Sequence, residues 1–358
     1  MAEVPFLVYQ RIVGFRLHFV DPHSPFSLYN EMKERGGMKP PSAERRMDRP
    51  WRGKGHCMYV ITGATGNIGS KVAGILLEKG EKVRVIGRSA DRLRQFVDKG
   101  AEAAVGNLKD SVFVTRAFKG ADAVFAMIPP DHAVTDLRAY QNEVGESLAS
   151  AITKAGVTNV VNLSSQGAGR LAGTGPIMGL ADQEQRLGRL KGVNIVHLRP
   201  TYFMENLLAN IPLITRQGIA VSAIRGDVKF AMIATRDIAA HVATLLVNRG
   251  FKGTSARDLL GERDLSLNEA VSVIGREIGK PDLKYVQFSY DDAAKSMREM
   301  GMSTDVSRLI NEMCKAINEG LLGAGRLRTP ENTTRTSIEE FALVFAEIFA
   351  SSTWRQAA

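Results

Sequence analysis

A short apolar segment that runs directly into three evenly spaced glycines restricts the fold of this chain most. Residues 58–62 read Met-Tyr-Val-Ile-Thr, Gly63, Gly66 and Gly69 come next, and residues 70–79 have a helix-like pattern. Such glycines permit a tight turn, a close approach of phosphate to the backbone, and close packing of helix on strand. A plain tight turn also uses glycine, but the flanking strand and helix favour a dinucleotide-binding turn. The residues expected around the pyrophosphate are Gly63, Thr65, Gly66, Asn67, Ile68 and Gly69.

Composition places the chain among soluble globular proteins. Its 358 residues are 44% hydrophobic and 24% charged, which is ordinary for that class. No apolar run approaches the roughly 20 residues that span a bilayer, so we predict no stable membrane insertion. Cys57 and Cys314 provide neither a disulfide framework nor the spacing of a metal site. We therefore expect a cytoplasmic protein without a bound metal.

The net charge of +9 raises the question of a nucleic-acid partner. The excess is spread along the chain, and no basic stripe alternates with aromatic residues as a nucleic-acid surface would show. A modest attraction for a phosphorylated cofactor explains the charge as well. We predict no nucleic-acid partner, and nothing in the sequence specifies an oligomeric state.

The first 57 residues differ from the rest of the chain, because they sustain no helical or strand period. We expect a disordered or non-native N-terminal extension there, and treat the Tyr-x-x-x-Lys match at residues 29–33 as chance. A cofactor-binding domain is predicted over residues 58–200 and a smaller, mostly helical substrate lobe over 201–350. That lobe is expected to interleave with the sheet edge, and residues 351–358 are predicted to form a tail.

Short β-branched segments alternate with amphipathic segments from residue 58 to residue 200. This alternation predicts a doubly wound parallel sheet with right-handed crossovers, in the strand order 3-2-1-4-5-6. Strands are predicted at residues 59–62, 82–86, 102–105, 123–127, 159–163 and 194–198, with helices near 67–80, 90–99, 109–118, 134–155 and 178–190.

Helical signals dominate after Pro200. Capping boxes are predicted at Ser266-x-x-Glu269 and Thr336-x-x-Glu339. An apolar stripe at helical spacing predicts a core-facing helix; it consists of Val306, Leu309, Ile310, Met313 and Ile317.

The end of the second predicted strand indicates the cofactor. An acidic residue there binds the adenosine ribose hydroxyls, whereas a basic one accommodates a 2′-phosphate. Arg88 and Ser89 occupy this position without an acidic residue before them, which favours NADP(H) and leaves NAD(H) possible; the alternative is a solvated arginine. Asn107 and Leu108 are expected at the adenine, although Asn107 could equally be a turn residue.

The later strand ends are expected to face the nicotinamide and the substrate, because ligands of open sheets bind beyond the carboxyl ends of strands. The fourth strand leads into Ile128 and Pro129, and the fifth into Ser164 and Ser165. The sixth leads into Tyr202, which with the next residue forms an aromatic pair that either walls a flat ligand or packs under the second lobe.

Taken together, these segments resemble the NmrA-like branch of the extended short-chain dehydrogenase/reductase superfamily from residue 58 to about 348. The resemblance rests on residues 61–66, 155–157, 198–200 and 203–206, with 237–239 and 301–303 in the smaller lobe. It implies a Rossmann fold and an NAD(P)H-dependent reductase of quinones, azo dyes, ketones or benzylic ethers. Some members instead bind the cofactor as regulators with little or no catalysis.

One departure from catalytic short-chain dehydrogenases narrows the chemistry. Residues 175–185 contain neither the tyrosine nor the lysine of a Tyr-x-x-x-Lys pair, which would protonate an alkoxide. We therefore expect hydride transfer to an aromatic or quinone-like small molecule, with Tyr202 or Ser164 as the proton donor. A redox sensor that binds the nucleotide and a protein partner is the second hypothesis. A nucleotide-sugar epimerase or dehydratase would need the missing tyrosine.

Overall fold

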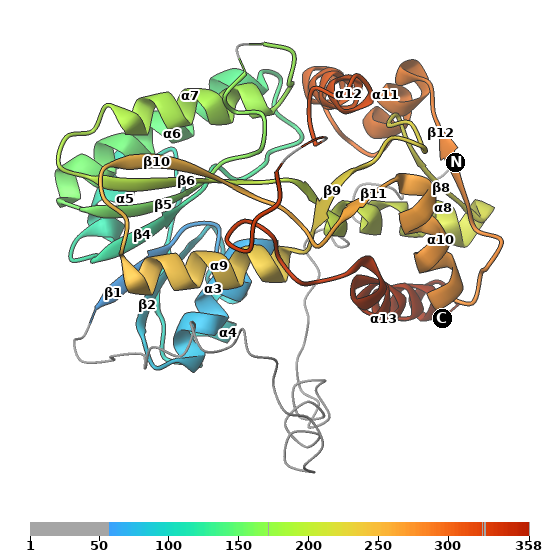
Figure 1. Ribbon diagram of the computed structural model, residues 1–358. Helices are drawn as coiled ribbons and strands as arrows, with labels where there is room; N and C mark the ends of the chain where they lie inside the picture. Colours follow the sequence, from blue (N-terminus) through green and yellow to red (C-terminus); the bar gives the residue numbers. More distant parts are fainter. Residues whose placement is uncertain (1–56, 171, 324, 326, 358) are drawn as a thin grey trace. The chain divides into compact units, whose positions relative to one another are not determined.

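The computed structural model describes residues 57–357 except 171, 324 and 326. The predictions for residues 1–56, including the pattern at residues 29–33, lie outside the described residues. One parallel sheet of seven strands has the order β10-β6-β5-β4-β1-β2-β3 (Figure 1). The predicted order of six strands is confirmed, and β10 extends it. The strands are β1 (Met58–Ile61), β2 (Lys82–Gly87), β3 (Glu102–Val105), β4 (Ala123–Ala126), β5 (Asn159–Leu163), β6 (Asn194–Pro200) and β10 (Thr254–Leu259).

Helices cover both faces of this sheet, as a parallel sheet requires. One face carries α3 (Asn67–Glu78), α4 (Ala90–Val97) and α9 (Thr235–Asn248), and the other carries α5 (Ser111–Phe118), α6 (Leu137–Ala155) and α7 (Ile177–Gly188) (Figure 1). All four residues of β4 are buried as a result. The helix α9 and the strand β10 join the sheet although they come after residue 200.

The remaining elements form a smaller lobe around a second core. It contains β7 (Tyr202–Phe203), η2 (Met204–Asn210), α8 (Ile211–Gln217), β8 (Ile219–Ser222), β9 (Phe230–Ile233), β11 (Asp264–Leu265), α10 (Leu267–Glu277), β12 (Lys284–Gln287), α11 (Tyr290–Glu299), α12 (Thr304–Asn318) and α13 (Ile338–Ala357). The apolar stripe of α12 faces the protein interior, as predicted. Ile310, Met313 and Ile317 pack in or against the lobe core, whereas Val306 and Leu309 pack with Leu137 of α6 and Met302. Residues 351–357, predicted as a tail, continue α13.

The two predicted capping boxes differ in outcome. Ser266 and Glu269 cap α10 reciprocally, as predicted. The box at Thr336 is wrong by one residue: the Ser337 hydroxyl accepts from the Glu340 N–H at 3.1 Å, and the Ser337 N–H donates to Glu340 at 3.3 Å. Thr336 is unavailable for capping because its hydroxyl and N–H both donate to Asp237.

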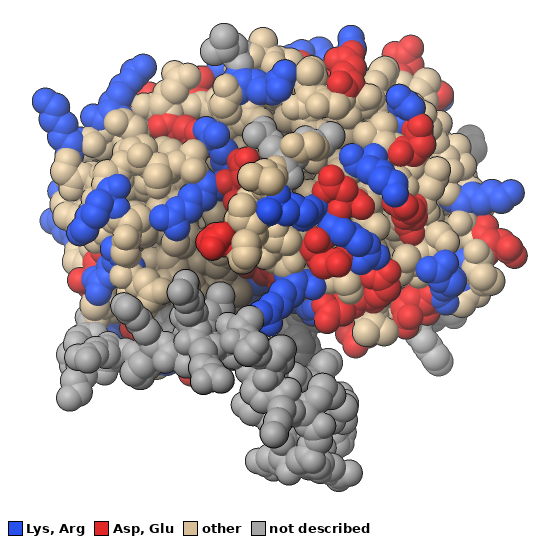
Figure 2. All heavy atoms as spheres, viewed as in Figure 1, with Lys and Arg blue, Asp and Glu red and all other residues tan. Residues whose placement is uncertain are grey.

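Acidic and basic side chains are intermixed over both the sheet and the smaller lobe on the face shown in Figure 2. In the part of the chain that the structure describes, no helix is long and apolar enough to cross a membrane. Within the same residues, no group of three or more His, Cys, Asp or Glu side chains could hold a metal ion.

Candidate functional site

The turn between β1 and α3 has the geometry that a pyrophosphate requires. Gly63 adopts φ of 63°, and its carbonyl accepts the Gly66 N–H at 2.9 Å. A Cβ at Gly69 would lie 2.3 Å from the Gly63 oxygen, so only glycine allows this approach of helix to strand. Gly66 caps α3 without a side-chain hydrogen bond, which leaves the first N–H groups of the helix, at Asn67 and Ile68, to receive an anion.

The end of β2 lies against this turn and carries two guanidinium groups. A Cβ at Gly87 would come within 3.3 Å of the Thr65 methyl. Arg88 is exposed, and Ser89 caps α4 by accepting the Arg92 N–H. The Arg92 guanidinium donates to the Thr65 carbonyl at 3.2 Å. Arg92 was not predicted, although a basic residue three positions after the capping serine is the sequence signal that could have indicated it.

The end of β3 lies beside that of β2, since the Gly106 N–H donates to the Gly87 carbonyl at 3.0 Å. Asn107 is exposed, and its side-chain oxygen accepts the Lys109 N–H at 3.0 Å. The alternative interpretation of Asn107 as a turn residue therefore fits, and its amide nitrogen is still available to an adenine. Leu108 is 7% exposed and belongs to the core.

The end of β4 is joined to α6 by a tyrosine that the sequence did not single out. Ile128 is buried, and the Pro129 carbonyl accepts the Tyr140 hydroxyl at 3.0 Å. The Lys109 ammonium lies 5.8 Å from the Tyr140 ring centre. Burial, together with a nearby aspartate, raises the pKa of Tyr140 to about 12, against the charge of Arg88. Tyr140 therefore lies between the predicted adenine and nicotinamide positions.

Ser164, at the end of β5, is engaged by α7. It is 3% exposed, and its hydroxyl donates to Glu184, which also accepts from Arg199 Nε at 2.8 Å. Burial raises the pKa of Glu184, but the hydrogen bonds from Arg199 and Ser164 outweigh it and leave that pKa below the ordinary value. A carboxylate held by arginine thus occupies the helix that would carry a Tyr-x-x-x-Lys pair. The hydroxyl of Ser165, which is half-buried, donates to the backbone carbonyl of the next residue.

The two neighbouring aromatic residues after β6, Tyr202 and Phe203, pack in different hydrophobic cores. Tyr202 packs in the smaller lobe, edge-on to Phe230 with ring centres 5.3 Å apart, whereas Phe203 packs against the sheet core. Burial raises the pKa of Tyr202 well above its ordinary value, which makes its phenol a weaker acid. Of the two alternative proton donors, Ser164 thus lies under α7, and the Tyr202 ring packs in the smaller lobe.

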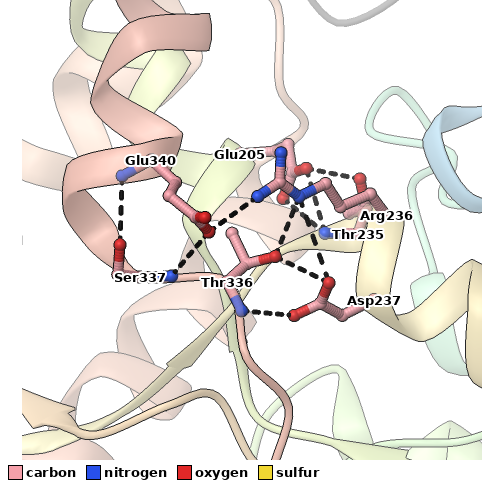
Figure 3. Close-up of polar contacts among 7 residues, drawn as sticks. All are labelled: Glu205, Thr235, Arg236, Asp237, Thr336, Ser337 and Glu340. Atoms are coloured by element: carbon pink, nitrogen blue, oxygen red, sulfur yellow. Dashed lines mark hydrogen bonds and ion pairs between the residues drawn. The ribbon is translucent and has the colours of Figure 1, made fainter. Parts of the chain in front are cut away.

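A half-buried carboxylate for which the sequence predicted no role, Glu205, lies two residues after this pair. Both oxygens of Glu205 accept the Thr235 N–H at 3.0 Å, so Glu205 caps the start of α9 (Figure 3). Burial raises the pKa of Glu205, against the Thr235 hydroxyl bond and the charge of Lys71. Burial also lowers the pKa of Lys71, whose ammonium donates to the Asn67 carbonyl at 2.9 Å. Glu205 therefore links the lobe to the helix of the glycine turn.

The same end of α9 holds the start of α13 (Figure 3). Arg236 donates to the Thr336 hydroxyl at 2.8 Å and to Glu340 at 2.9 Å. Asp237 accepts the Thr336 N–H at 3.0 Å. The lobe is thus tied to the sheet at two points of a single helix end.

A pocket of about 630 Å³ lies where the start of α6, residues 172–178 and α12 meet. Its lining is strongly polar, and its acidic groups have structural partners. Asp136 accepts the Ala139 N–H at 2.8 Å and Asp305 accepts the Leu137 N–H at 2.9 Å. The first contact caps α6 and the second joins α12 to α6, so this lining offers little apolar wall to a flat ring.

Comparisons with known proteins agree with this geometry. An NAD(P)H azoreductase from Xenophilus azovorans is 28% identical over 303 residues, which cover 82% of this chain and 100% of that protein. A (4-alkanoyl-5-oxo-2,5-dihydrofuran-3-yl)methyl phosphate reductase from Streptomyces griseus is 30% identical over 240 residues, or 67% of this chain and 80% of that protein. These relatives are named as reductases.

Solved structures share the fold. An NADPH-dependent quinone oxidoreductase from Escherichia coli, complexed with NADPH, superposes with a TM-score of 0.62 at 21% identity, covering 80% of this chain and 98% of that one. A triphenylmethane reductase from Citrobacter sp., complexed with NADP(H), gives 0.66 at 17%, covering 81% and 99%. The family model for the NmrA-like family matches residues 58–341, so the predicted resemblance is confirmed and the chain belongs to the NmrA-like family.

Proposed function

We propose that this chain is a reductase that prefers NADP(H) over NAD(H) and transfers a hydride to a flat, conjugated carbonyl or quinone-like molecule. One observation carries the proposal. The dinucleotide turn is intact, while Glu184, bound to Ser164 and Arg199, occupies the helix where dehydrogenases place an acid–base pair.

The backbone of the glycine turn would hold the pyrophosphate, and Arg88 and Arg92 would hold the 2′-phosphate through charge-assisted hydrogen bonds. The exposed Arg88 at the end of β2 and the Arg92 guanidinium, which donates to the Thr65 carbonyl, support the preference for the phosphorylated cofactor. When bound, the reduced nicotinamide supplies a hydride.

The strand ends favour an acceptor whose reduced form needs little help from an acid. Ser164 is held by a carboxylate, and burial makes the Tyr202 phenol a weaker acid. A quinone or a conjugated ring spreads the incoming charge over its own π system, whereas an aliphatic ketone concentrates it on one alkoxide. The names of the relatives, which concern azo, quinone and triphenylmethane acceptors, support this class.

The test is steady-state oxidation of NADPH and of NADH by the full chain with menadione, an azo dye and an aliphatic ketone. We expect the quinone to react fastest and NADPH to be the better donor. Preference for the aliphatic ketone would contradict the proposal. Tight NADPH binding without turnover on any acceptor would favour the redox sensor instead.

A further inference from the structure

Two buried side chains at the carboxyl ends of β5 and β6 have polar atoms without a hydrogen-bond partner. Gln166 is 4% exposed and Thr201 is 5% exposed. The Gln166 Nε2 and the Thr201 Oγ1 contact no partner among the residues that the structure describes. Buried polar groups are nearly always paired, and an unpaired one lowers stability. Two such groups on adjacent strand ends indicate that a ligand completes them.

The backbone places the two residues side by side. The Ser164 N–H donates to the Leu198 carbonyl at 2.8 Å, and the Gln166 N–H donates to the Pro200 carbonyl at 3.0 Å, directly before Thr201. The backbone hydrogen bonds between the two strand ends thus continue past the last residue of β5 to Gln166, where a turn begins. Gln166 therefore lies beyond Ser164 at the carboxyl edge of the sheet.

The turn after Gln166 meets the smaller lobe. A Cβ at Gly167 would lie 2.3 Å from the Leu322 side chain, and the Arg170 guanidinium donates to the Leu321 carbonyl at 3.3 Å. Gln166 therefore lies between the sheet edge and the lobe, where ligands of open α/β sheets bind.

Two other side chains at these strand ends already donate to Glu184. The Ser164 hydroxyl and two nitrogens of Arg199 are bound to Glu184. A side-chain amide offers two N–H donors and does not release a proton. Such a donor suits an oxygen that becomes negatively charged rather than one that must be protonated by the enzyme.

We propose that the Gln166 amide, with the Thr201 hydroxyl, binds the carbonyl oxygen of the acceptor and stabilises the negative charge that develops there. The inference rests on the proposed function. The quinone takes up a hydride, one hydrogen with its electron pair, and the nicotinamide is left oxidised; the product is the hydroquinone monoanion, with one O–H and one O⁻. The O⁻ then takes a proton from water, which leaves hydroxide and completes the hydroquinone.

A second glutamine provides a matched control. Gln183 is 1% exposed and its Nε2 also lacks a partner within the described part of the chain. It lies on α7, where its side-chain oxygen accepts from Arg186 at 2.9 Å and faces Gly145 of α6. This position is between two helices rather than at the strand ends, so Gln183 should not affect the acceptor.

The experiment compares Gln166→Leu, Thr201→Val and Gln183→Leu with the wild-type chain. With menadione and NADPH, we expect Gln166→Leu to lower kcat at least about tenfold, as loss of an oxyanion donor does, and Thr201→Val to lower it less. Both variants should melt at or above the wild-type temperature, because an unpaired buried group has been removed. Gln183→Leu should keep the wild-type kcat. A kcat within twofold of wild type in both strand-end variants would overturn the inference.

Titration calorimetry with menadione, without NADPH, separates this inference from the proposed function. We expect the dissociation constant to rise in Gln166→Leu and to stay unchanged in Gln183→Leu. If the wild-type chain binds menadione but reduces nothing, the proposed function fails, and the calorimetry alone decides the inference. An unchanged dissociation constant in both strand-end variants, or no binding to the wild type, overturns it. If Gln166→Leu does not fold, Gln166→Met is measured in its place together with Thr201→Val, and the same results support or overturn the inference.

Discussion

The proposed cofactor-binding edge has two ends that differ in construction: a nucleotide end at β1 and β2, and a hydride end at β5 and β6. At the nucleotide end the backbone forms the site: Gly63 has φ of 63°, and a Cβ at Gly69 would strike the Gly63 oxygen. At the hydride end side chains form the site, and each one's chemistry depends on a distant partner. Ser164 donates to Glu184, and Tyr202, which is half-buried, packs edge-on against Phe230.

This difference determines which substitutions matter and why. A backbone site tolerates no added atom but depends little on ionisation. The hydride end should tolerate changes in side-chain shape but should be sensitive to changes of charge, because Ser164 and Arg199 both donate to the Glu184 carboxylate. Substitutions at each end should therefore distinguish these two modes of construction.

The largest effect should come from the carboxylate of the hydride end. Glu184→Ala removes the partner of Arg199, whose side chain is 24% exposed, while the side chain of Glu184 is only 10% exposed. Breaking a buried pair leaves an uncompensated charge and should cost about 3 kcal/mol. That corresponds to a fall of roughly 6–12 °C in the melting temperature.

Glu146→Ala is the matched control, because the Glu146 side chain that pairs with Arg186 is 72% exposed. It should cost at most about 1 kcal/mol. Equal melting temperatures for the two variants would show that the Glu184–Arg199 pair stabilises the fold no more than the exposed Glu146–Arg186 pair does.

Acid should weaken the same pair. Hydrogen bonds from Arg199 and Ser164 leave the pKa of Glu184 below its ordinary value despite burial. A depressed folded-state pKa stabilises the fold above the unfolded-state pKa of about 4.3, and this contribution is lost as the pH falls through the folded-state pKa. The stability gap between wild type and Glu184→Gln, measured by urea unfolding, should therefore narrow from pH 7 toward pH 3. A stability difference that widens in acid would mean that folding raises the pKa of Glu184 rather than lowers it.

The nucleotide end should respond to a single added methyl group. Gly69→Ala places a Cβ 2.3 Å from backbone oxygen and should destabilise the chain by about 1–3 kcal/mol, as overpacking does. It should also weaken NADPH binding. Gly74→Ala is the control in the same helix, because a Cβ there meets nothing within 4 Å; it should be neutral or stabilising by up to ~1 kcal/mol. Identical unfolding curves for Gly69→Ala and Gly74→Ala would contradict the conclusion that the backbone around Gly69 cannot accommodate a Cβ.

The same contrast explains what the sequence could predict. The glycine turn was predictable because its spacing directly expresses a backbone requirement. Five of the six strands were predictable from buried apolar segments, and the largely exposed β3 from its place in the alternation of strands and helices. The edge strand β10, which contains Arg257 and Asp258, was not, since it follows residue 200, where helical signals dominate. The partnership of Ser164 with Glu184 spans 20 residues and depends on how α7 lies over β5. No local pattern encodes that placement.

The preference for NADPH over NADH should change by a smaller free energy than the stability changes above. Arg88→Ala removes the exposed guanidinium that follows β2 and should weaken NADPH binding roughly tenfold, or ~1.4 kcal/mol, with NADH nearly unchanged. Arg92→Ala should act in the same direction, since Arg92 contacts the turn. Arg94→Ala, an exposed arginine of α4, is the control. Equal affinity of the wild type for both cofactors would make Arg88 a solvated residue.

The smallest effect should come from removal of the Tyr202 hydroxyl. General acid catalysis contributes roughly 10²–10⁴-fold, but burial raises the pKa of Tyr202 and makes proton release at neutral pH unfavourable. Tyr202→Phe keeps the ring that packs edge-on to Phe230. We therefore expect kcat with menadione to fall less than about tenfold, below the range of general acid catalysis. A loss of a hundredfold or more, together with a changed pH–rate profile, would make Tyr202 the proton donor and would show that burial does not decide the chemistry of the hydride end.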